Sequence, residues 1–313
     1  MSNNRILAIG LEALQACANE PDVDCVGYLE AFALPDWMPS KIDGPLIGED
    51  VPVFKDVEAA VAATRPDFAL IAVPNYAKND VEMESALMRA GVSILCTKLR
   101  LPDWRCAGQL EQLRARSGVD YRVGEHYHLN PVVHYARQHL ATIGRPELLR
   151  YRFSSRLNPS GSPWMRAYRE VLLEDLCYHH FSVLHFLLGF ELEQCQLRSG
   201  SYSGGGGHQD RLDLLGETTG GYCLNYSGWW GSHARPDAWL GSIDIEGKQG
   251  CLQISGDQLY LNGVTVPVSG ETAPSFIRAV LTGEDAPERM LSRLEDFLPV
   301  TRSIQKGLDT LGI

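Results

Sequence analysis

Short apolar runs and amphipathic segments alternate through the first third of the chain, and this alternation restricts the fold more than any other feature. Apolar runs occupy residues 5–10, 23–29, 67–75 and 92–98. Most positions in each run are apolar, as in strands that are buried on both faces. Apolar strands separated by helices predict a parallel sheet that helices cover on both sides.

Helix signals stand between these runs. Residues 11–19, 57–65 and 78–91 carry apolar side chains at helical spacing. Asp56 is placed to cap the second of these segments, and Gly91 is placed to end the third. The first third of the chain therefore predicts a Rossmann-like α/β domain.

The pattern changes near residue 122. Residues 121–131 are strand-like, residues 132–144 are helical, and several short strands with Gly-rich turns follow between residues 194 and 261. Residues 274–313 are helical again. This order predicts an α+β domain with a mostly antiparallel open sheet.

We therefore expect two domains. The first is a dinucleotide-binding domain over residues 1–122, and the second is a substrate and oligomerisation domain over residues 123–313. The last helices are expected to pack back on the first domain. A chain of 313 residues is long enough for two separate cores.

Charge and composition exclude several functions. The net charge of −11 and the pI near 5.3 disfavour nucleic acids and anionic membranes as partners, because both need a basic surface. No run approaches the ~18 apolar residues of a membrane span. Eight scattered cysteines form no Cys-x-x-Cys pair, which indicates reduced thiols and a cytoplasmic protein.

The segment from Arg5 to Glu30 has the order of a nucleotide-binding unit, which is a strand, a helix and a second strand closed by an acidic residue. A dinucleotide fingerprint places three glycines between the first strand and the helix, and here Gly10 stands alone. Glu12 adds a negative charge where a pyrophosphate would lie. We expect Glu30 to accept the ribose hydroxyls.

Five segments follow one another along the chain: "IAVPN" at 71–75, "LCTKLRL" at 95–101, "VGEHYHLNP" at 123–131, "LEDLCYHH" at 173–180 and "GSIDIEGKQGCLQI" at 241–254. Their order resembles that of the glucose–fructose oxidoreductase, inositol dehydrogenase and MocA-type (Gfo/Idh/MocA) oxidoreductases. The resemblance covers nearly the whole chain. It implies a Rossmann domain with an open-sheet domain, NAD or NADP as cofactor, and a sugar-like or polyol substrate.

The resemblance also implies roles for particular residues. His179 would be the catalytic base, Lys98 would polarise the substrate oxygen, and Asp175 would orient it. The spacing of Asp175 and His179 by four residues on a helix predicts that they share one face. Pro74 and Asn75 join Gly10 and Glu30 as expected cofactor-binding residues.

Four further polar residues are expected at the substrate side. They are His126, His128, Asn130 and His180. His126 and His128 are two apart in a strand-like segment, which predicts that they point to one side. With His179 and Asp175 they could bind zinc or iron, but no complete ligand motif occurs and we expect no metal.

Three functions remain open at this point. The first is an NAD(P)-dependent oxidoreductase, the second is a non-redox acid–base enzyme such as a lyase or isomerase, and the third is a catalytically silent partner subunit. Thr97 and Leu99 stand where the family has Glu and Pro around the lysine, which favours the second and third. Trp229 and Trp230 on the later sheet predict an interface in a homo-oligomer, a dimer or tetramer.

Overall fold

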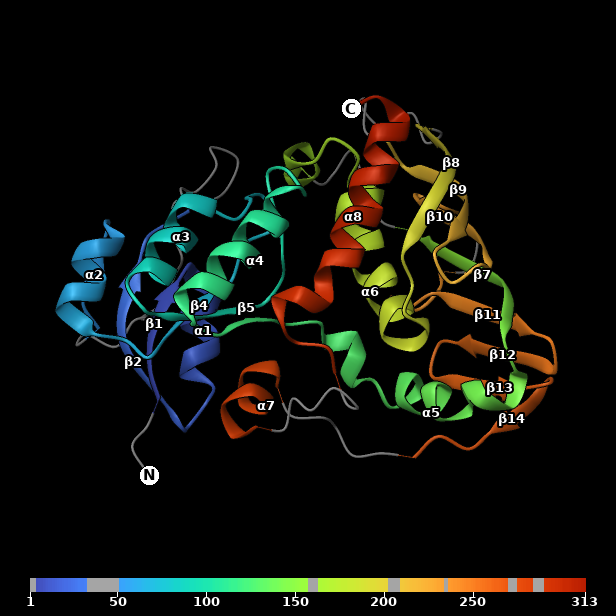
Figure 1. The fold of residues 1–313 in the computed structure, drawn as a ribbon, viewed down its shortest axis with the longest axis horizontal. Coiled ribbons are helices and arrows are strands. Elements are labelled where there is room, and N and C mark those ends of the chain that lie inside the picture. The colour runs from blue at the N-terminus through green and yellow to red at the C-terminus, as the bar shows by residue number, and fades with distance from the viewer. Residues whose placement is uncertain are drawn as a thin grey trace. The chain divides into compact units, whose positions relative to one another are not determined.

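The structure is a computed structural model that describes residues 4–32, 51–156, 163–201, 209–233, 236–269, 275–283 and 290–313. The chain divides into two compact units (Figure 1). The first unit contains residues 1–125, 274–287 and 291–296, and the second contains residues 126–273, 288–290 and 297–313. Each unit has its own sheet.

The sheet of the first unit is parallel throughout its described strands. Its six strands stand in the order β3-β2-β1-β4-β5-β6. This is the strand order of the doubly wound dinucleotide-binding fold. The strands are β1 Asn4–Ile9, β2 Val23–Leu29, β3 Val53–Phe54, β4 Phe68–Ile71, β5 Ser93–Cys96 and β6 Tyr121–Val123.

Five helices lie wholly within the described residues of the first unit. They are α1 Leu11–Ala18, α2 Val57–Thr64, α3 Val81–Arg89, α4 Cys106–Ser117 and α7 Phe276–Thr282. The side chains of Asp56 and Asp80 cap α2 and α3 by accepting backbone N–H groups, and the cap by Asp56 confirms the prediction from its position in the sequence.

Helix α7 completes a core that begins at the other end of the chain. Ile277 is buried in a cluster with residues of β1, α1, β4 and β5, and Phe276 packs against the same cluster. The would-be Cβ of Gly124 lies 2.8 Å from the Phe276 ring, so this position accepts glycine alone without movement. The first unit is therefore built from separate pieces of sequence.

The second unit contains an eight-stranded, mostly antiparallel sheet. Its order is β14-β13-β12-β11-β7-β10-β9-β8, in which β7 and β10 form a parallel pair. The strands are β7 Pro146–Ser155, β8 Leu192–Gly200, β9 Arg211–Thr218, β10 Cys223–Trp230, β11 Ser242–Gly247, β12 Gly250–Ser255, β13 Gln258–Leu261 and β14 Val264–Val266.

Helices cover one face of this sheet (Figure 1). They are α5 Pro131–His139, α6 Cys177–Leu188 and, from Phe297 on, α8 Leu294–Leu311. Helix α6 contacts the sheet through His180, whose ring stacks on Tyr151 at a centroid distance of 4.3 Å. Helix α8 binds the edge strand β8, because the hydroxyl of Ser303 accepts the N–H of Leu192.

The predicted fold class is confirmed: a parallel Rossmann-like sheet is followed by a mostly antiparallel one. The strand-like reading of residues 121–131 is wrong beyond Val123, because His126–Leu129 form a 3₁₀ helix and Pro131 starts α5. Pro at the first helical position favours this helix start. Within the described residues, none of the helices combines the length and apolar composition that crossing a membrane would need.

The tryptophans of β10 were expected together at an interface, and this expectation is wrong for Trp230. Consecutive strand residues point to opposite faces. Trp230 is buried on the helix side and contacts Trp164 edge-on, whereas Trp229 is half-buried on the other face under the guanidinium of Arg211.

Candidate functional site

The strand order of the first unit reverses between β1 and β4, and open α/β sheets bind ligands at that point. Gly10 lies there with φ +88°, and an added Cβ would stand 2.8 Å from the Ala72 carbonyl oxygen and 3.1 Å from the Phe32 ring. The backbone therefore requires glycine at position 10. The helix α1 begins at the next residue, so no further loop separates β1 from α1.

Glu30 borders a pocket of about 390 Å³ beyond the end of β2. The pocket lies between the end of β2, the N-terminal end of α2 and one side of α3 along its length. Its charged lining residues are five carboxylates and two cations, namely Glu30, Asp56, Glu58, Asp80, Glu82, Lys55 and Arg89. The pocket is thus strongly polar and net negative.

Pro74 and Asn75 form the turn that follows β4, and Arg100 holds this turn. The Arg100 guanidinium donates to the Pro74 carbonyl at 3.3 Å and to the Asn75 amide oxygen at 2.6 Å. Arg100 is 6% exposed. The expected cofactor-binding residues Gly10, Pro74 and Asn75 thus come together at the ends of β1 and β4.

Lys98 lies just after β5 and is 8% exposed. Hydrogen bonds fix the backbone on both sides of Lys98. The Lys98 carbonyl accepts a hydrogen bond from the Cys96 thiol at 3.1 Å. Two residues further on, the Arg100 N–H donates to the Asn79 side chain and the Arg100 carbonyl accepts the Asn79 N–H. Asn79 in turn donates its amide to the carboxylate of Glu84. Lys98 therefore has a well-fixed main chain at the carboxyl end of its strand.

Glu84 is a fully buried carboxyl group on α3. Burial raises its pKa to about 7, and the hydrogen bond from Asn79 offsets part of this shift. Because Glu84 is partly protonated near neutral pH, the interior of the first unit does not contain a full negative charge at this position.

In the second unit, a π-helical turn over Leu172–Leu176 leads into α6. Such turns are frequent at functional sites, because they shift the side chains that follow. Asp175 lies in this turn, and its carboxylate accepts the hydroxyl of Tyr168 at 2.9 Å. The wider turn means that the four-residue spacing of Asp175 and His179 does not by itself fix them on one face.

His179 is half-buried on α6 and lies among other rings. Its ring meets those of His126, Tyr127 and Tyr178 edge-on, at centroid distances of 5.6, 5.5 and 5.3 Å. His126 is exposed. The structure thus brings two of the predicted histidines, His126 and His179, together in one polar and aromatic group.

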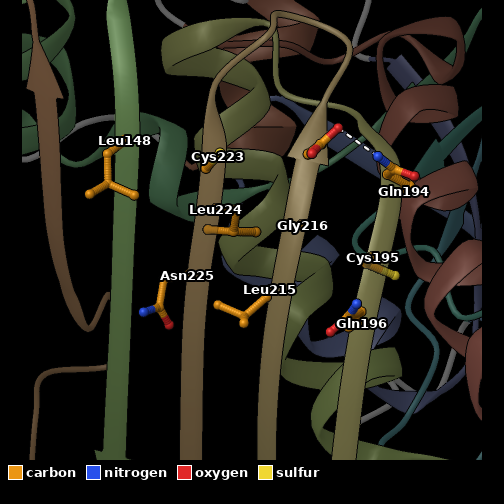
Figure 2. Close-up of a pocket in the computed structure, with 10 residues that line it drawn as sticks. Leu148, Gln194, Cys195, Gln196, Leu215, Gly216, Cys223, Leu224 and Asn225 are labelled. Carbon is orange, nitrogen blue, oxygen red and sulfur yellow. Dashed lines mark hydrogen bonds between the residues drawn. The ribbon is translucent and has the colours of Figure 1, made fainter.

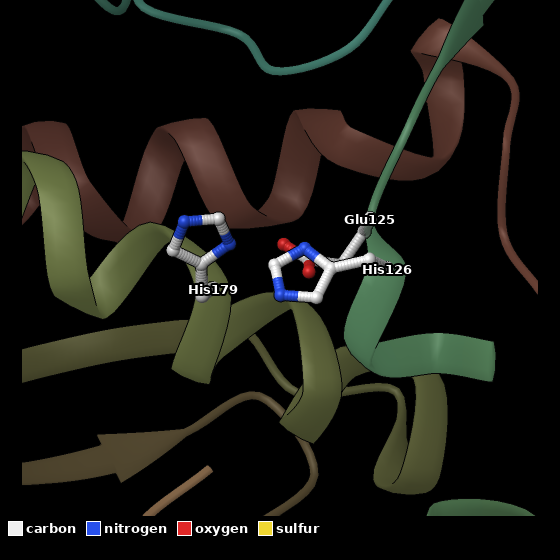
Figure 3. A group of neighbouring side chains, drawn as sticks. All are labelled: Glu125, His126 and His179. Carbon is white, nitrogen blue, oxygen red and sulfur yellow. The ribbon is translucent and has the colours of Figure 1, made fainter. Parts of the chain in front are cut away.

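Glu125 directly precedes His126 in the chain, and Figure 3 shows its carboxylate beside the two rings. Ligand atoms of Glu125, His126 and His179 all lie within 4.8 Å of one another. Two imidazoles and a carboxylate are groups that bind divalent cations. The expectation that the chain has no metal site stays a prediction.

Two other predicted residues, His128 and His180, are engaged in the core of the second unit. His128 is fully buried, bonds Ser182 through Nε2 and stacks on Phe186. His180 is also fully buried, and its two ring nitrogens bond the Tyr226 hydroxyl and the Trp239 carbonyl. These positions do not fit the expected contact with substrate, because both side chains are engaged in packing.

Asn130 caps α5 by accepting the N–H of Val132 at 3.0 Å. The expectation that His126 and His128 point to one side is also wrong, because the 3₁₀ helix replaces the strand. His126 remains at the surface while His128 enters the core. A substrate role for Asn130 remains untested.

Sequence reasoning missed Arg100, Tyr127 and Tyr168. Arg100 lies two residues after Lys98, so the end of β5 was a signal that could have found it. Tyr168 lies seven residues before Asp175 across an irregular turn, and no spacing rule indicates that contact.

None of the described helices covers the face of the second sheet that lies away from α5, α6 and α8. A shallow pocket of about 470 Å³ extends there across strands β7, β10, β9 and β8. Figure 2 shows Leu148, Leu215 and Asn225 among the residues that line it. Leu215 is 57% exposed. Gln194 and Glu217 are joined by a 2.6 Å hydrogen bond across the edge strands.

Comparison with solved structures shows what kind of protein has this architecture. An oxidoreductase from Thermotoga maritima superposes with a TM-score of 0.75 at 17% identity, covering 99% of this chain and 97% of that one. An oxidoreductase from Agrobacterium radiobacter, solved with NAD+, L-tartaric acid and magnesium, gives 0.74 at 16%, covering 100% and 97%. The chain thus has the fold of the Gfo/Idh/MocA-type oxidoreductases, and the resemblance seen in the sequence is confirmed at the level of the fold.

Particular relatives act on sugars. A UDP-N-acetylglucosamine 3-dehydrogenase from Acidithiobacillus ferrooxidans superposes with a TM-score of 0.69 at 16% identity, covering 100% of this chain and 97% of that one. D-apiose dehydrogenase from Paraburkholderia graminis is 26% identical over 213 residues, which are 66% of this chain. The match spans 55% of that enzyme's length. The chain matches no family model.

Proposed function

We propose that the protein is an NAD-dependent oxidoreductase that converts a secondary hydroxyl of a sugar-like or polyol substrate to a ketone. The observation that carries this proposal is the strand order of the first unit, with Gly10 and the Pro74–Asn75 turn following β1 and β4 at the reversal point and Glu30 following the neighbouring strand β2. The activities of the structural and curated relatives support it.

Gly10 allows the tight turn from β1 into α1 beside the Ala72 carbonyl, and Glu30 borders a pocket where ribose hydroxyls would find a carboxylate. These residues fit the adenosine half of the cofactor. When bound, a nicotinamide dinucleotide supplies the acceptor for the hydride that leaves the substrate carbon.

The chain's own residues supply the proton chemistry. We assign to His179 the removal of the hydroxyl proton, because its imidazole can accept a proton near neutral pH. Lys98 binds the substrate oxygen and stabilises the negative charge that develops on it. Asp175, held by Tyr168, orients the substrate hydroxyls.

The net negative charge of the pocket beside Glu30 favours NAD over NADP as the cofactor. The pocket has five carboxylates against two cations, so the 2′-phosphate of NADP would meet a net negative surface. We therefore propose NAD rather than NADP. An assay of NADH formation with a panel of aldoses and polyols tests the reaction, and NADP+ in parallel tests the selection. Turnover without any dinucleotide would favour the lyase or isomerase reading instead.

We expect the protein to bind NADH weakly, with a dissociation constant in the high micromolar range or above when no substrate is present. The reason is the single glycine at the turn, which removes amide contacts to the pyrophosphate, and each ~1.4 kcal/mol lost costs tenfold in affinity. Glu30→Ala should weaken binding a further tenfold or so, because the ribose loses a charged acceptor. Calorimetric titration measures both.

Asp24→Ala is the matched control, because Asp24 lies exposed on the same strand β2 away from the pocket. It should leave the affinity unchanged. Submicromolar binding by the unaltered protein would contradict the prediction and indicate an ordinary dinucleotide site.

We propose that the open face of the second sheet binds a second copy of the chain. Leu215 is 57% exposed at the centre of the pocket on this face. It shares the pocket lining with the half-buried Leu148 and with polar residues such as Gln196 and Asn225. An exposed apolar side chain in a shallow hollow of an open sheet favours burial against a second copy. The unaltered protein should therefore sediment as a dimer or tetramer at micromolar concentration. Leu215→Lys should raise the dissociation constant at least tenfold, because two copies would each bury a charge.

Val53→Lys is the matched control for this substitution. Val53 is 53% exposed, close to the value for Leu215, and lies on β3 of the first unit. It should leave the oligomeric state as it is. A monomeric unaltered protein, or equal behaviour of the two lysine variants, would refute the proposed interface.

A further inference from the structure

Arg100 is a buried arginine at the carboxyl ends of the strands of the first unit. Its Nη1 donates to the Pro74 carbonyl at 3.3 Å and its Nη2 donates to the Asn75 side chain at 2.6 Å. Its backbone N–H donates to Asn79 Oδ1 at 2.6 Å, and its carbonyl accepts the Asn79 N–H at 2.7 Å. Both its main chain and its guanidinium are therefore fixed beside the turn after β4.

Glu12 brings a negative charge to the same place. It lies in the first turn of α1, two residues after Gly10, and Gly10 abuts the Ala72 carbonyl just beyond β4. Partial desolvation raises the pKa of Glu12, and the positive charge of Arg100 lowers it. Glu12 at the start of α1 and Arg100 on the turn after β4 therefore stand at neighbouring strand ends, where the guanidinium favours the ionised carboxylate.

This pairing matters for an anionic ligand. A glycine-rich turn holds a diphosphate with backbone N–H groups at a helix N-terminus. Here α1 begins directly after one glycine and has an acidic residue in its first turn. A diphosphate at this position would meet the Glu12 charge, so it requires a cation close by.

We propose that Arg100 is the residue that allows this short turn to accept the diphosphate of a dinucleotide, by offsetting the charge of Glu12 and by holding the Pro74–Asn75 turn. The inference rests on the proposed dinucleotide function and assigns its phosphate subsite. Arg100 acts here as a positioning and charge-compensating residue. Its guanidinium takes over part of the role that amide groups have in a glycine-rich loop.

The test compares ADP, which carries the diphosphate, with adenosine, which does not. Binding of each is followed by NMR titration, which resolves weak affinities. Arg100→Gln should weaken ADP binding at least tenfold and leave adenosine binding within about twofold. Arg100→Lys keeps the charge and should retain ADP binding within about threefold. Arg105→Gln removes an exposed arginine of the same segment and should change neither.

Glu12→Gln provides a second, independent measurement that does not disturb the buried arginine. It should tighten ADP binding about threefold or more and leave adenosine unaffected. In the Glu12→Gln background, the loss caused by Arg100→Gln should shrink to about threefold, because the charge to be offset is gone. Additive effects of the two substitutions would overturn the pairing.

The outcomes separate this inference from the proposed function. If the unaltered protein binds ADP and Arg100→Gln binds it equally well, the role of Arg100 is refuted while the cofactor proposal stands. If the unaltered protein binds neither ADP nor NADH, the cofactor proposal falls and this inference falls with it. If Arg100→Gln does not fold, the Glu12→Gln result decides: unchanged ADP affinity overturns the inference.

Discussion

The substitution His179→Ala lowers the rate of substrate oxidation by about 10²- to 10⁴-fold. This is the range that proton transfer by a positioned side chain contributes to a rate. The thermal midpoint changes little, because His179 is half-buried and its ring contacts are edge-on rather than packed in the core. The measurement is the rate of NADH formation with the best substrate of the aldose and polyol panel, alongside thermal denaturation of the same samples.

His233→Ala serves as the matched control, because His233 is an exposed histidine of the same unit. It should keep full activity. Turnover of His179→Ala within a few-fold of the unaltered protein would show that the proton leaves by another group. The remaining function classes, lyase or isomerase and silent subunit, would then have to be reconsidered.

Glu84→Gln makes the protein more stable at pH 8 and leaves its stability nearly unchanged at pH 5. The folded-state pKa of Glu84 is raised to about 7 from 4.5, so the folded protein holds a proton that the unfolded chain has lost. Stability therefore falls as the pH rises from about 4.5 to 7 and is lower above that range. Glutamine does not ionise, so the Glu84→Gln variant does not lose stability through this group as the pH rises.

The shift corresponds to about 3 kcal/mol at most, or about two orders of magnitude in the folding equilibrium. Denaturant unfolding between pH 5 and pH 8 measures it. Glu82→Gln is the matched control, because Glu82 is exposed on the same helix. If the free energies of unfolding of Glu84→Gln and of the unaltered protein changed in parallel with pH, the prediction would be wrong. The carboxyl group of Glu84 would then have the same protonation in the folded and unfolded states.

The first unit was predictable from sequence because its signals are local. Strands such as Phe68–Ile71 are continuous apolar runs, and Asp56 and Asp80 stand one residue before the helices they cap. Gly10 was also predictable, since a turn from strand to helix at a positive φ demands glycine. The parallel sheet follows from the alternation of such elements.

The second unit shows where such reasoning fails. A two-residue alternation suggested a strand for His126 and His128, but Pro131 and the Asn130 cap impose a helical entry that separates the two side chains. His180 looked like a site residue from its neighbour His179, yet adjacent helical residues point about 100° apart. Its partner Tyr226 is 46 residues distant, and no local pattern indicates such a contact.

The position of α7 has a consequence for the synthesis of the protein. Ile277 and Phe276 belong to the same hydrophobic cluster as β1 and α1, but about 150 residues of the second unit are made between the end of β6 and α7. A ribosome adding 5–20 residues per second needs roughly 8 to 30 s for that stretch. During this interval the nascent first unit exposes part of its core, because Phe276 and Ile277 have not yet been made. The second unit is itself completed by the part of α8 from Phe297 on, which follows α7 in the chain. Neither core can therefore close fully until α7 and α8 have both been synthesised.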